Sequence, residues 1–296
     1  MTQILPLLPA LLLEALFYFL PAWPAFRQRF LNLNPYLQAV LLWVSAIAPI
    51  LLLNLLQGHP PEELALLLTA TAIVCAWYLL LPKRPVADLL LMVLLAAFVL
   101  SDWFLPLFPS PEGAPKLGAL NKLLWLRLGM GVFLFLRRSE VPGFGLWPNR
   151  KDWLEGIRQF AFFLAILLPV GVGFKLLRYQ LPKVDDWQLP FLAIGSFLGF
   201  YLFVAFCEDF FFRGILQPLL SKELGGRWRG LLSASLCFGA VHLPFRGFPN
   251  WRQAVVASVL GLFCGMAFNR AASLRASMIT HALVVAVWTI FFARSF

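Results

Sequence analysis

Five ionisable side chains lie inside apolar runs of the C-terminal half, and these residues could do chemistry. They are Glu208, Asp209, Arg213, His242 and His281. Ionisable groups at membrane depth are costly and are usually functional. A carboxylate that lacks a nearby cation could act as a general base. A carboxylate and two imidazoles could instead supply three ligands to a zinc ion.

The spacing of the acidic run gives its two carboxylates different surroundings. Asp209 and Arg213 are four residues apart, so they can form an ion pair on one helix face. Glu208 points about 100° away, toward a different neighbour, and has no local cation. We therefore expect Asp209 and Arg213 to be structural and Glu208 to be the candidate general base. On another apolar run, Phe238 shares a helix face with His242.

Helix geometry places three of these side chains at similar depths. With assumed cytoplasmic helix ends at 220, 231 and 272, Glu208, His242 and His281 lie about 18, 16 and 14 Å deep. All three depths are near the middle of a hydrocarbon core about 30 Å thick. We expect the three side chains to form one site. A polar clamp between helices, without a catalytic role, is the alternative.

The elements that must position these residues follow from the composition. Of the 296 residues, 61% are apolar and 13% are charged, and the mean hydropathy is +0.81. Soluble domains have about 45–50% apolar and about 25% charged residues. A water-soluble globule and a disordered chain are therefore excluded. We predict an all-α polytopic transmembrane bundle of about ten spans, with its catalytic core in the C-terminal half: 4–22, 37–56, 64–81, 86–107, 117–136, 159–177, 189–220, 231–243, 252–269 and 272–292.

Polarity divides the predicted bundle into three segments. Residues 1–136 form an N-terminal transmembrane extension, 137–158 a cytoplasmic loop with an interfacial helix, and 159–296 the core. Asn149 is expected to cap that interfacial helix, with Asp152 completing a partial capping box. The net charge of +10 is attributed to cytoplasmic loops that meet anionic lipid. Nucleic acid is not an expected partner, because no basic stripe with interleaved aromatics occurs.

The N-terminal half carries fewer polar residues inside its apolar runs. Asp88 lies near a helix start, where the helix dipole favours a carboxylate, and is expected to be structural. Glu14 is expected to lack a charged partner. Lys122 and Arg127 are expected to extend toward the membrane interfaces.

Three motifs of the C-terminal half resemble those of a known protein family. The run EDFFFRG, which begins at Glu208, resembles an EExxxR motif. The run FGAVH from Phe238 to His242 resembles FxxxH, and the run from His281 resembles HxxxN or HxxxD. In this order the motifs resemble those of the CPBP or Abi intramembrane proteases, which include CAAX-type prenyl proteases and bacteriocin-processing enzymes. The resemblance covers roughly residues 150–292.

The resemblance implies a metal-free endopeptidase that acts on a hydrophobic or prenylated peptide. Glu208, assisted by His242, would activate a water molecule, and His281 would hold or protonate the oxyanion. Two positions depart from the family pattern. Asp209 replaces a glutamate but keeps its charge, whereas Val285 replaces an Asn or Asp that is thought to help stabilise the oxyanion. Val285 cannot donate a hydrogen bond, so we weigh three substitutes: Ser277, Asn269 and His281 itself.

Three other interpretations stay open. The first is a zinc site formed by Glu208, His242 and His281. The second is a non-catalytic family member that binds hydrophobic peptides as a scaffold, as Val285 would allow. The third is a proton-coupled transporter, which the unlike polarity of the two halves disfavours.

The expected location is a multi-pass position in a bacterial inner membrane. The oligomeric state stays undetermined. Two GxxxG spacings are expected to pack helices within the chain: Gly195 with Gly199, and Gly261 with Gly265.

Overall fold

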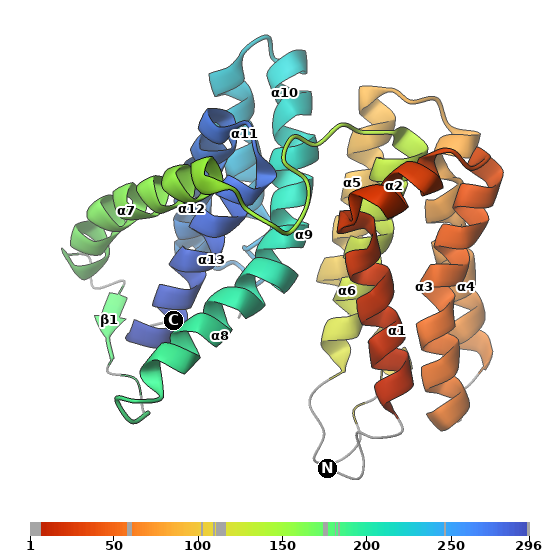
Figure 1. Cartoon of the computed structure of the whole chain (residues 1–296), viewed down its shortest axis with the longest axis horizontal. Coiled ribbons are helices and arrows are strands. Elements are labelled where there is room, and N and C mark those ends of the chain that lie inside the picture. Colours follow the sequence, from red (N-terminus) through yellow and green to blue (C-terminus); the bar gives the residue numbers. More distant parts are fainter. Residues whose placement is uncertain are drawn as a thin grey trace. The chain divides into compact units, whose positions relative to one another are not determined.

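The structure of the protein is a computed structural model that describes residues 7–57, 61–101, 103–108, 110, 117–173, 177–180, 182, 184–245 and 247–294. The chain divides into two compact units, Met1–Glu140 and Val141–Phe296. Both units are built from helices, which confirms the predicted all-α class (Figure 1). Two three-residue strands, β1 Leu177–Tyr179 and β2 Phe292–Arg294, pair antiparallel in the second unit.

In the first unit, proline sets where four of the helices begin. Pro24, Pro35, Pro61 and Pro85 are the first residues of α2 to α5. Proline fits a first helical position because its fixed φ suits the helix and the N–H it lacks would have no partner there. The elements of this unit are α1 Leu8–Phe19, η2 Leu20–Ala22, α2 Pro24–Leu31, α3 Pro35–Gln57, α4 Pro61–Leu80, α5 Pro85–Leu100, η3 Leu105–Leu107, α6 Gly118–Gly131 and the π-helical η4 Val132–Arg137.

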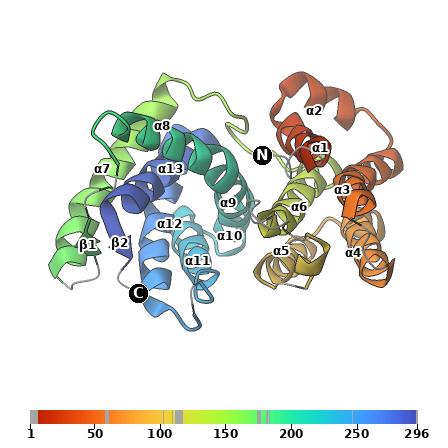
Figure 2. The same ribbon diagram turned by 90° about the horizontal axis from the view of Figure 1, so that it is seen from below.

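The second unit contains one long helical run that includes the acidic motif. Residues Leu189–Glu223 form a continuous helical stretch (Figure 2). Two π-helical segments in it flank the short helix α9. Segments of π-helix are rare in proteins, and those that occur are often at functional sites. The elements of this unit, besides the two strands, are α7 Arg150–Gly173, α8 Leu189–Gly199, η5 Phe200–Ala205, α9 Phe206–Asp209, η6 Phe210–Leu216, α10 Gln217–Glu223, α11 Arg227–Ala240, α12 Trp251–Ala271 and α13 Leu274–Phe291.

The structure supports fewer membrane spans than the ten apolar stretches predicted. Within the described residues, six helices are long and apolar enough to cross a membrane, or seven if α1–η2 and α2, bent by 82°, count as one span. Helix α11 has 14 residues, and at about 1.5 Å per residue it is shorter than a hydrocarbon core of about 30 Å. Helix α1 has 12 residues and leads into the bend. The multi-span membrane class is confirmed.

Helix α7 joins two segments that were predicted separately. It runs unbroken from Arg150 to Gly173, so the expected interfacial helix and the following span are one helix. Its start has the predicted cap. The Asn149 backbone N–H donates to Asp152 Oδ2, and the Asp152 N–H donates to Asn149 Oδ1, both at 2.9 Å. Asp152 also pairs with Arg275 Nε at 3.0 Å, which ties the start of α7 to the start of α13.

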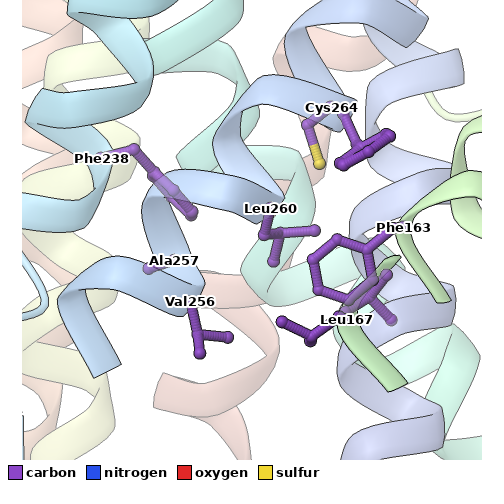
Figure 3. Close-up of a cluster of buried hydrophobic side chains, with 9 residues drawn as sticks. Phe163, Leu167, Phe238, Val256, Ala257, Leu260 and Cys264 are labelled. Carbon is purple, nitrogen blue, oxygen red and sulfur yellow. The ribbon is translucent and has the colours of Figure 1, made fainter. Parts of the chain in front are cut away.

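The hydrophobic core of the second unit surrounds α12. Phe163 and Leu167 of α7 and Phe238 of α11 pack with α12 side chains that include Leu260 and Cys264 (Figure 3). The tight packing of α12 against α11 depends on small residues. A Cβ atom at Gly261 would lie 3.0 Å from the Cα of Ser235, and one at Gly265 would collide with Leu231.

The two GxxxG spacings differ in what they contact. Gly261 and Gly265 pack within the chain, as predicted. The expectation for Gly195 and Gly199 was wrong, because a Cβ atom at either position would meet no atom within 4 Å. These two glycines lie on α8, a helix without buried residues.

Two buried carboxylates of the first unit, Glu14 and Asp88, are each paired with an arginine, which corrects the expectation for Glu14. Arg127 Nε donates to Glu14 Oε1 at 2.6 Å, and Arg127 Nη2 donates to Glu14 Oε2 at 2.8 Å. Arg127 is therefore buried and does not extend to an interface, whereas Lys122 is exposed. Asp88 accepts hydrogen bonds from Tyr78 Oη at 2.7 Å and from Arg137 Nε at 2.8 Å, in keeping with a structural role.

Candidate active site

The two carboxylates of the acidic motif, Glu208 and Asp209, end α9, and Arg213 lies in the π-helical segment η6 that follows. Asp209 and Arg213 are both buried, and Arg213 Nη1 lies 2.7 Å from Asp209 Oδ1. This confirms the ion pair predicted from their spacing. The Glu208 side chain is 30% exposed, so it can meet a water molecule or a substrate while Asp209 cannot.

One imidazole lies between the two carboxylates. His281 of α13 places Nε2 3.8 Å from Glu208 Oε2 and Nδ1 3.5 Å from Asp209 Oδ1. As predicted, Asp209 pairs with Arg213 while Glu208 faces a different neighbour, His281. The sequence did not predict that His281 also lies near Asp209. The two carboxylate side chains leave the helix in different directions, and the His281 ring lies between them.

The second imidazole, His242, lies in the turn just after α11 and contacts the last turn of that helix. His242 Nδ1 lies 2.7 Å from the Phe238 carbonyl oxygen, four residues earlier. A protonated Nδ1 would donate this bond and leave Nε2 available to a ligand. The Phe238 ring centroid lies 4.8 Å from that of His242 and 5.6 Å from that of His281. The Arg213 guanidinium carbon lies 4.3 Å from the same ring centroid, a cation–π contact, so Phe238 connects three site residues.

A cavity of about 310 Å³ joins the predicted catalytic residues. Glu208, His242 and His281 all line it. Its other walls are Phe200, Val204, Phe238, Phe245, Gln253, Val256, Ala257, Leu260, Val284, Val285, Trp288 and Thr289. Most of these side chains are apolar, which is typical of a pocket for a hydrophobic ligand.

The structure separates the three residues that we weighed as substitutes at position 285. Val285 lines the cavity, so its lack of a donor affects the site directly. Ser277 is fully buried and does not line the cavity. Asn269 also lies outside the cavity wall, and its Oδ1 accepts from Gln217 Nε2 at 3.1 Å. His281 therefore is the one of the three that borders the cavity.

Comparisons with known proteins agree with this geometry. Residues 190–287 match the family described as type II CAAX prenyl endopeptidase Rce1-like. The chain is also 30% identical over 96 residues to YpbD of Bacillus subtilis (strain 168), a protein described as uncharacterised. Residues 190–287 form an Rce1-like domain. The match to YpbD covers 32% of this chain and 45% of that protein, and no solved structure matches the chain.

The Rce1-like domain contains the residues of all three motifs. It extends from the start of α8 into the last turns of α13, and it includes Glu208, Phe238, His242, His281 and Val285. The family resemblance predicted from those motifs is therefore confirmed for this part of the chain.

The residues of the Rce1-like domain also allow a test of the zinc alternative. Among the described residues, one set of possible ligand atoms lies within 4.8 Å of one another, and it belongs to Asp209, Cys264 and His281. Neither Glu208 nor His242 is in this set. Arg213 already pairs with Asp209, and its positive charge disfavours a metal cation there. The donor set therefore fits a metal ion poorly.

Two polar residues of the cavity wall were not predicted from the sequence. Gln253 of α12 and Thr289 of α13 line the cavity, yet neither belongs to a motif. The helix period held a signal for Thr289, which is four residues beyond Val285 and eight beyond His281 on one helix face. Gln253 carried no such signal, because its place depends on how α12 packs against α13.

Proposed function

We propose that the second unit is an intramembrane endopeptidase that hydrolyses a peptide bond of a hydrophobic or lipidated substrate. The observation that carries this proposal is the cavity in which Glu208, His242 and His281 meet between apolar walls. A carboxylate and two imidazoles facing one space can activate water and exchange protons with it. The apolar walls suit a substrate that partitions into lipid.

In the proposed reaction, Glu208 takes a proton from water while the water oxygen attacks the peptide carbonyl carbon. His242, through its free Nε2, helps to orient that water. His281 donates from Nε2 to the oxyanion, and the Asp209 carboxylate lies 3.5 Å from its Nδ1. The proton then passes to the amine nitrogen as the carbon–nitrogen bond breaks, which leaves a new carboxyl group and a new amine.

Val285 lowers the rate of peptide cleavage that we expect. Removal of one oxyanion donor costs about 10²–10³-fold in rate in a well-studied soluble protease. With valine at this position, the side chain that follows His281 on the cavity face of α13 offers no donor to the oxyanion. We therefore expect slow cleavage by the natural protein and faster cleavage by Val285→Asn.

The segment roles that we propose follow from the same site. Residues 159–296 form the protease core, 137–158 the cytoplasmic loop with the start of α7, and 1–136 a transmembrane extension. The multi-pass position is assigned to a bacterial inner membrane, and the match to a Bacillus protein supports that source. No metal ion takes part in the proposed reaction.

A non-catalytic scaffold is the second candidate function. Val285 on the cavity wall favours it, because the cavity could bind an apolar peptide without efficient stabilisation of an oxyanion. Such a protein would bind peptides and leave them intact.

A cleavage assay in liposomes separates the two functions. Wild type, Glu208→Gln and Val285→Asn would be compared on a mixed library of hydrophobic and prenylated peptides, with products identified by mass spectrometry. Cleavage by wild type that is lost in Glu208→Gln supports the endopeptidase. Activity that appears only in Val285→Asn identifies a scaffold whose catalytic function has been lost. Cleavage by Glu208→Gln at the wild-type rate contradicts the proposed mechanism.

A further inference from the structure

The chain segment that leads into α7, residues 141–147, packs behind the acidic motif (yellow-green loop in Figure 1). The ring centroid of Phe144 lies 5.4 Å from that of Phe206 and 5.6 Å from that of Phe210. These two phenylalanines come two residues before and two residues after Glu208, so each points about 160° away from it around the helix. Both are fully buried, whereas Glu208 lines the cavity. Phe144 therefore packs against the face of the helix opposite to the cavity.

The same segment contacts the π-helical segments on either side of α9. Tyr201 of η5 donates from Oη to the carbonyl oxygen of Leu146 at 3.1 Å. In η6, a Cβ atom at Gly214 would lie 2.8 Å from Cγ1 of Val141, so the backbone approaches this side chain closely. A π-helix has i→i+5 hydrogen bonds, and a return to the i→i+4 bonds of an α-helix would rotate the residues between η5 and η6 about the helix axis. Contacts on both π-helical segments oppose such a rotation of Glu208.

Segment 141–147 is also bound to the start of α13, the helix that carries His281. The Leu274 backbone N–H donates to the Pro142 carbonyl oxygen at 2.8 Å. Arg275 Nη1 donates to the Trp147 carbonyl oxygen at 3.0 Å. His281 follows Leu274 by seven residues, which is about two helical turns. The position of His281 therefore depends on a helix start that this segment holds.

A glycine allows the closest of these contacts. Gly143 has a φ of 65°, in the left-handed region that favours glycine. A Cβ atom at this position would collide with Ser273, the residue just before α13. The backbone of segment 141–147 therefore lies directly against the residue from which α13 begins.

One segment thus contacts both helices whose side chains must meet in the proposed reaction. Glu208 Oε2 and His281 Nε2 lie 3.8 Å apart. We propose that segment 141–147 holds these two side chains at their working separation, with Phe144 as a positioning residue for Glu208. The inference rests on the proposed function. Because Phe144 is not one of the residues that line the cavity, it acts through the helix and not through contact with the substrate.

The test truncates Phe144 and compares it with a matched phenylalanine of the first unit. Phe135 also packs with two other phenylalanines, and its ring centroid lies 6.2 Å from that of Phe26 and 4.4 Å from that of Phe30. Cleavage of a fluorescent apolar peptide in liposomes gives KM and kcat for the folded fraction of wild type, Phe144→Ala, Phe144→Leu and Phe135→Ala. Equilibrium binding of the same peptide to each protein in a Glu208→Gln background gives Kd without turnover.

We expect Phe144→Ala to change turnover without changing affinity. A misplacement of about 1 Å can cost about 10²-fold in rate, so kcat should fall about 10–10²-fold while KM and Kd keep their wild-type values. Phe144→Leu restores an apolar side chain behind the helix and should recover most of the lost kcat. Tyr201→Phe removes only the hydrogen bond to Leu146, and its loss of kcat should be smaller than that of Phe144→Ala. Phe135→Ala should keep the wild-type kcat.

A second readout does not depend on cleavage. Nuclear magnetic resonance is recorded on protein with isotopically labelled histidine, and the resonance of His281 is assigned by its absence in His281→Leu. The chemical shift of this ring depends on the Glu208 carboxylate 3.8 Å from its Nε2. Phe144→Ala should therefore move the resonance, whereas Phe135→Ala should leave it in place.

The two readouts separate failure of the positioning role from failure of the proposed function. A shifted His281 resonance in Phe144→Ala, without cleavage by wild type, would support the positioning role and refute the endopeptidase. A wild-type resonance in Phe144→Ala would overturn the positioning role, whether or not wild type cleaves. A loss of kcat in Phe135→Ala as large as that in Phe144→Ala would identify a general packing defect and also overturn it. Raised KM and Kd in Phe144→Ala with an unchanged kcat would overturn it as well.

Discussion

Each of the two units buries an arginine against a carboxylate, but the two ion pairs differ in how fully they are hydrogen-bonded. In the first unit, Arg127 and Glu14 form two hydrogen bonds in a bidentate arrangement. In the second unit, Arg213 lies 2.7 Å from Asp209 Oδ1, yet neither Asp209 oxygen has an aligned hydrogen-bond donor among the residues that the structure describes. The contact is short but its geometry is poor, so the second pair is less fully satisfied.

The pair in the first unit also repairs a defect in the backbone. Pro49 lies inside α3 and has no N–H, so the carbonyl oxygen of Ser45, four residues earlier, loses its helical donor. Arg127 Nη2 donates to that oxygen at 2.9 Å. The guanidinium thus satisfies both a buried carboxylate and a carbonyl left open by proline. This is what a structural ion pair requires.

The site in the second unit leaves polar atoms open beside a cavity. Glu208 Oε2 and His281 Nδ1 are buried without a hydrogen-bond partner among the described residues, and Glu208 and His281 both line the cavity. Burying such atoms costs folding free energy unless a ligand or a water molecule forms a hydrogen bond with them. The two ion-paired regions thus differ in how completely their buried ionisable atoms are hydrogen-bonded.

The largest expected effect on stability comes from breaking the complete pair. Glu14→Gln leaves the Arg127 charge buried without a counter-charge, which costs about 3–5 kcal/mol. Unfolding in a denaturing detergent should show this loss, while the activity of each folded molecule should stay at the wild-type level. A variant with normal stability but lower kcat would place Glu14 in the chemistry and remove the contrast between the units.

A substitution at the site around His281 should show the opposite pattern, with a large loss of kcat and a small loss of stability. His281→Leu removes the ring between the two carboxylates and its hydrogen-bond donors, and loss of an oxyanion donor lowers kcat by about 10²–10³-fold. Its free energy of unfolding should change far less than that of Glu14→Gln. Steady-state cleavage and detergent unfolding of the same preparations measure both quantities. A large loss of stability with normal kcat would make His281 a structural residue.

The smallest effect is expected for Ser45→Ala. The Ser45 hydroxyl lies 3.3 Å from Arg127 Nη1, whereas the backbone carbonyl contact to Arg127 is kept in the variant. One such hydrogen bond is worth about 0.5–1.5 kcal/mol, and we expect a loss near the lower end. A loss as large as that of Glu14→Gln would show that the hydroxyl, and not the carboxylate, holds the guanidinium.

Local spacing and helix rise predicted much of the candidate site. The four-residue interval predicted the ion pair of Asp209 with Arg213, and the estimated depths predicted that Glu208, His242 and His281 would share one site. Contacts between distant segments could not be predicted in this way. Glu14 and Arg127 are 113 residues apart, and Gln253 reaches the cavity through the packing of α12 on α13. The two π-helical segments around α9 also left no pattern in the sequence that the analysis used.

The central claim is that Glu208 acts in chemistry and that Glu14 acts in structure. The most direct measurement is the cleavage rate of wild type, Glu208→Gln and Glu14→Gln in liposomes, normalised to folded protein and using a peptide that wild type cleaves. The account predicts that wild type and Glu14→Gln cleave at the same rate and that Glu208→Gln loses about 10²–10⁴-fold. Equal rates for wild type and Glu208→Gln would contradict it.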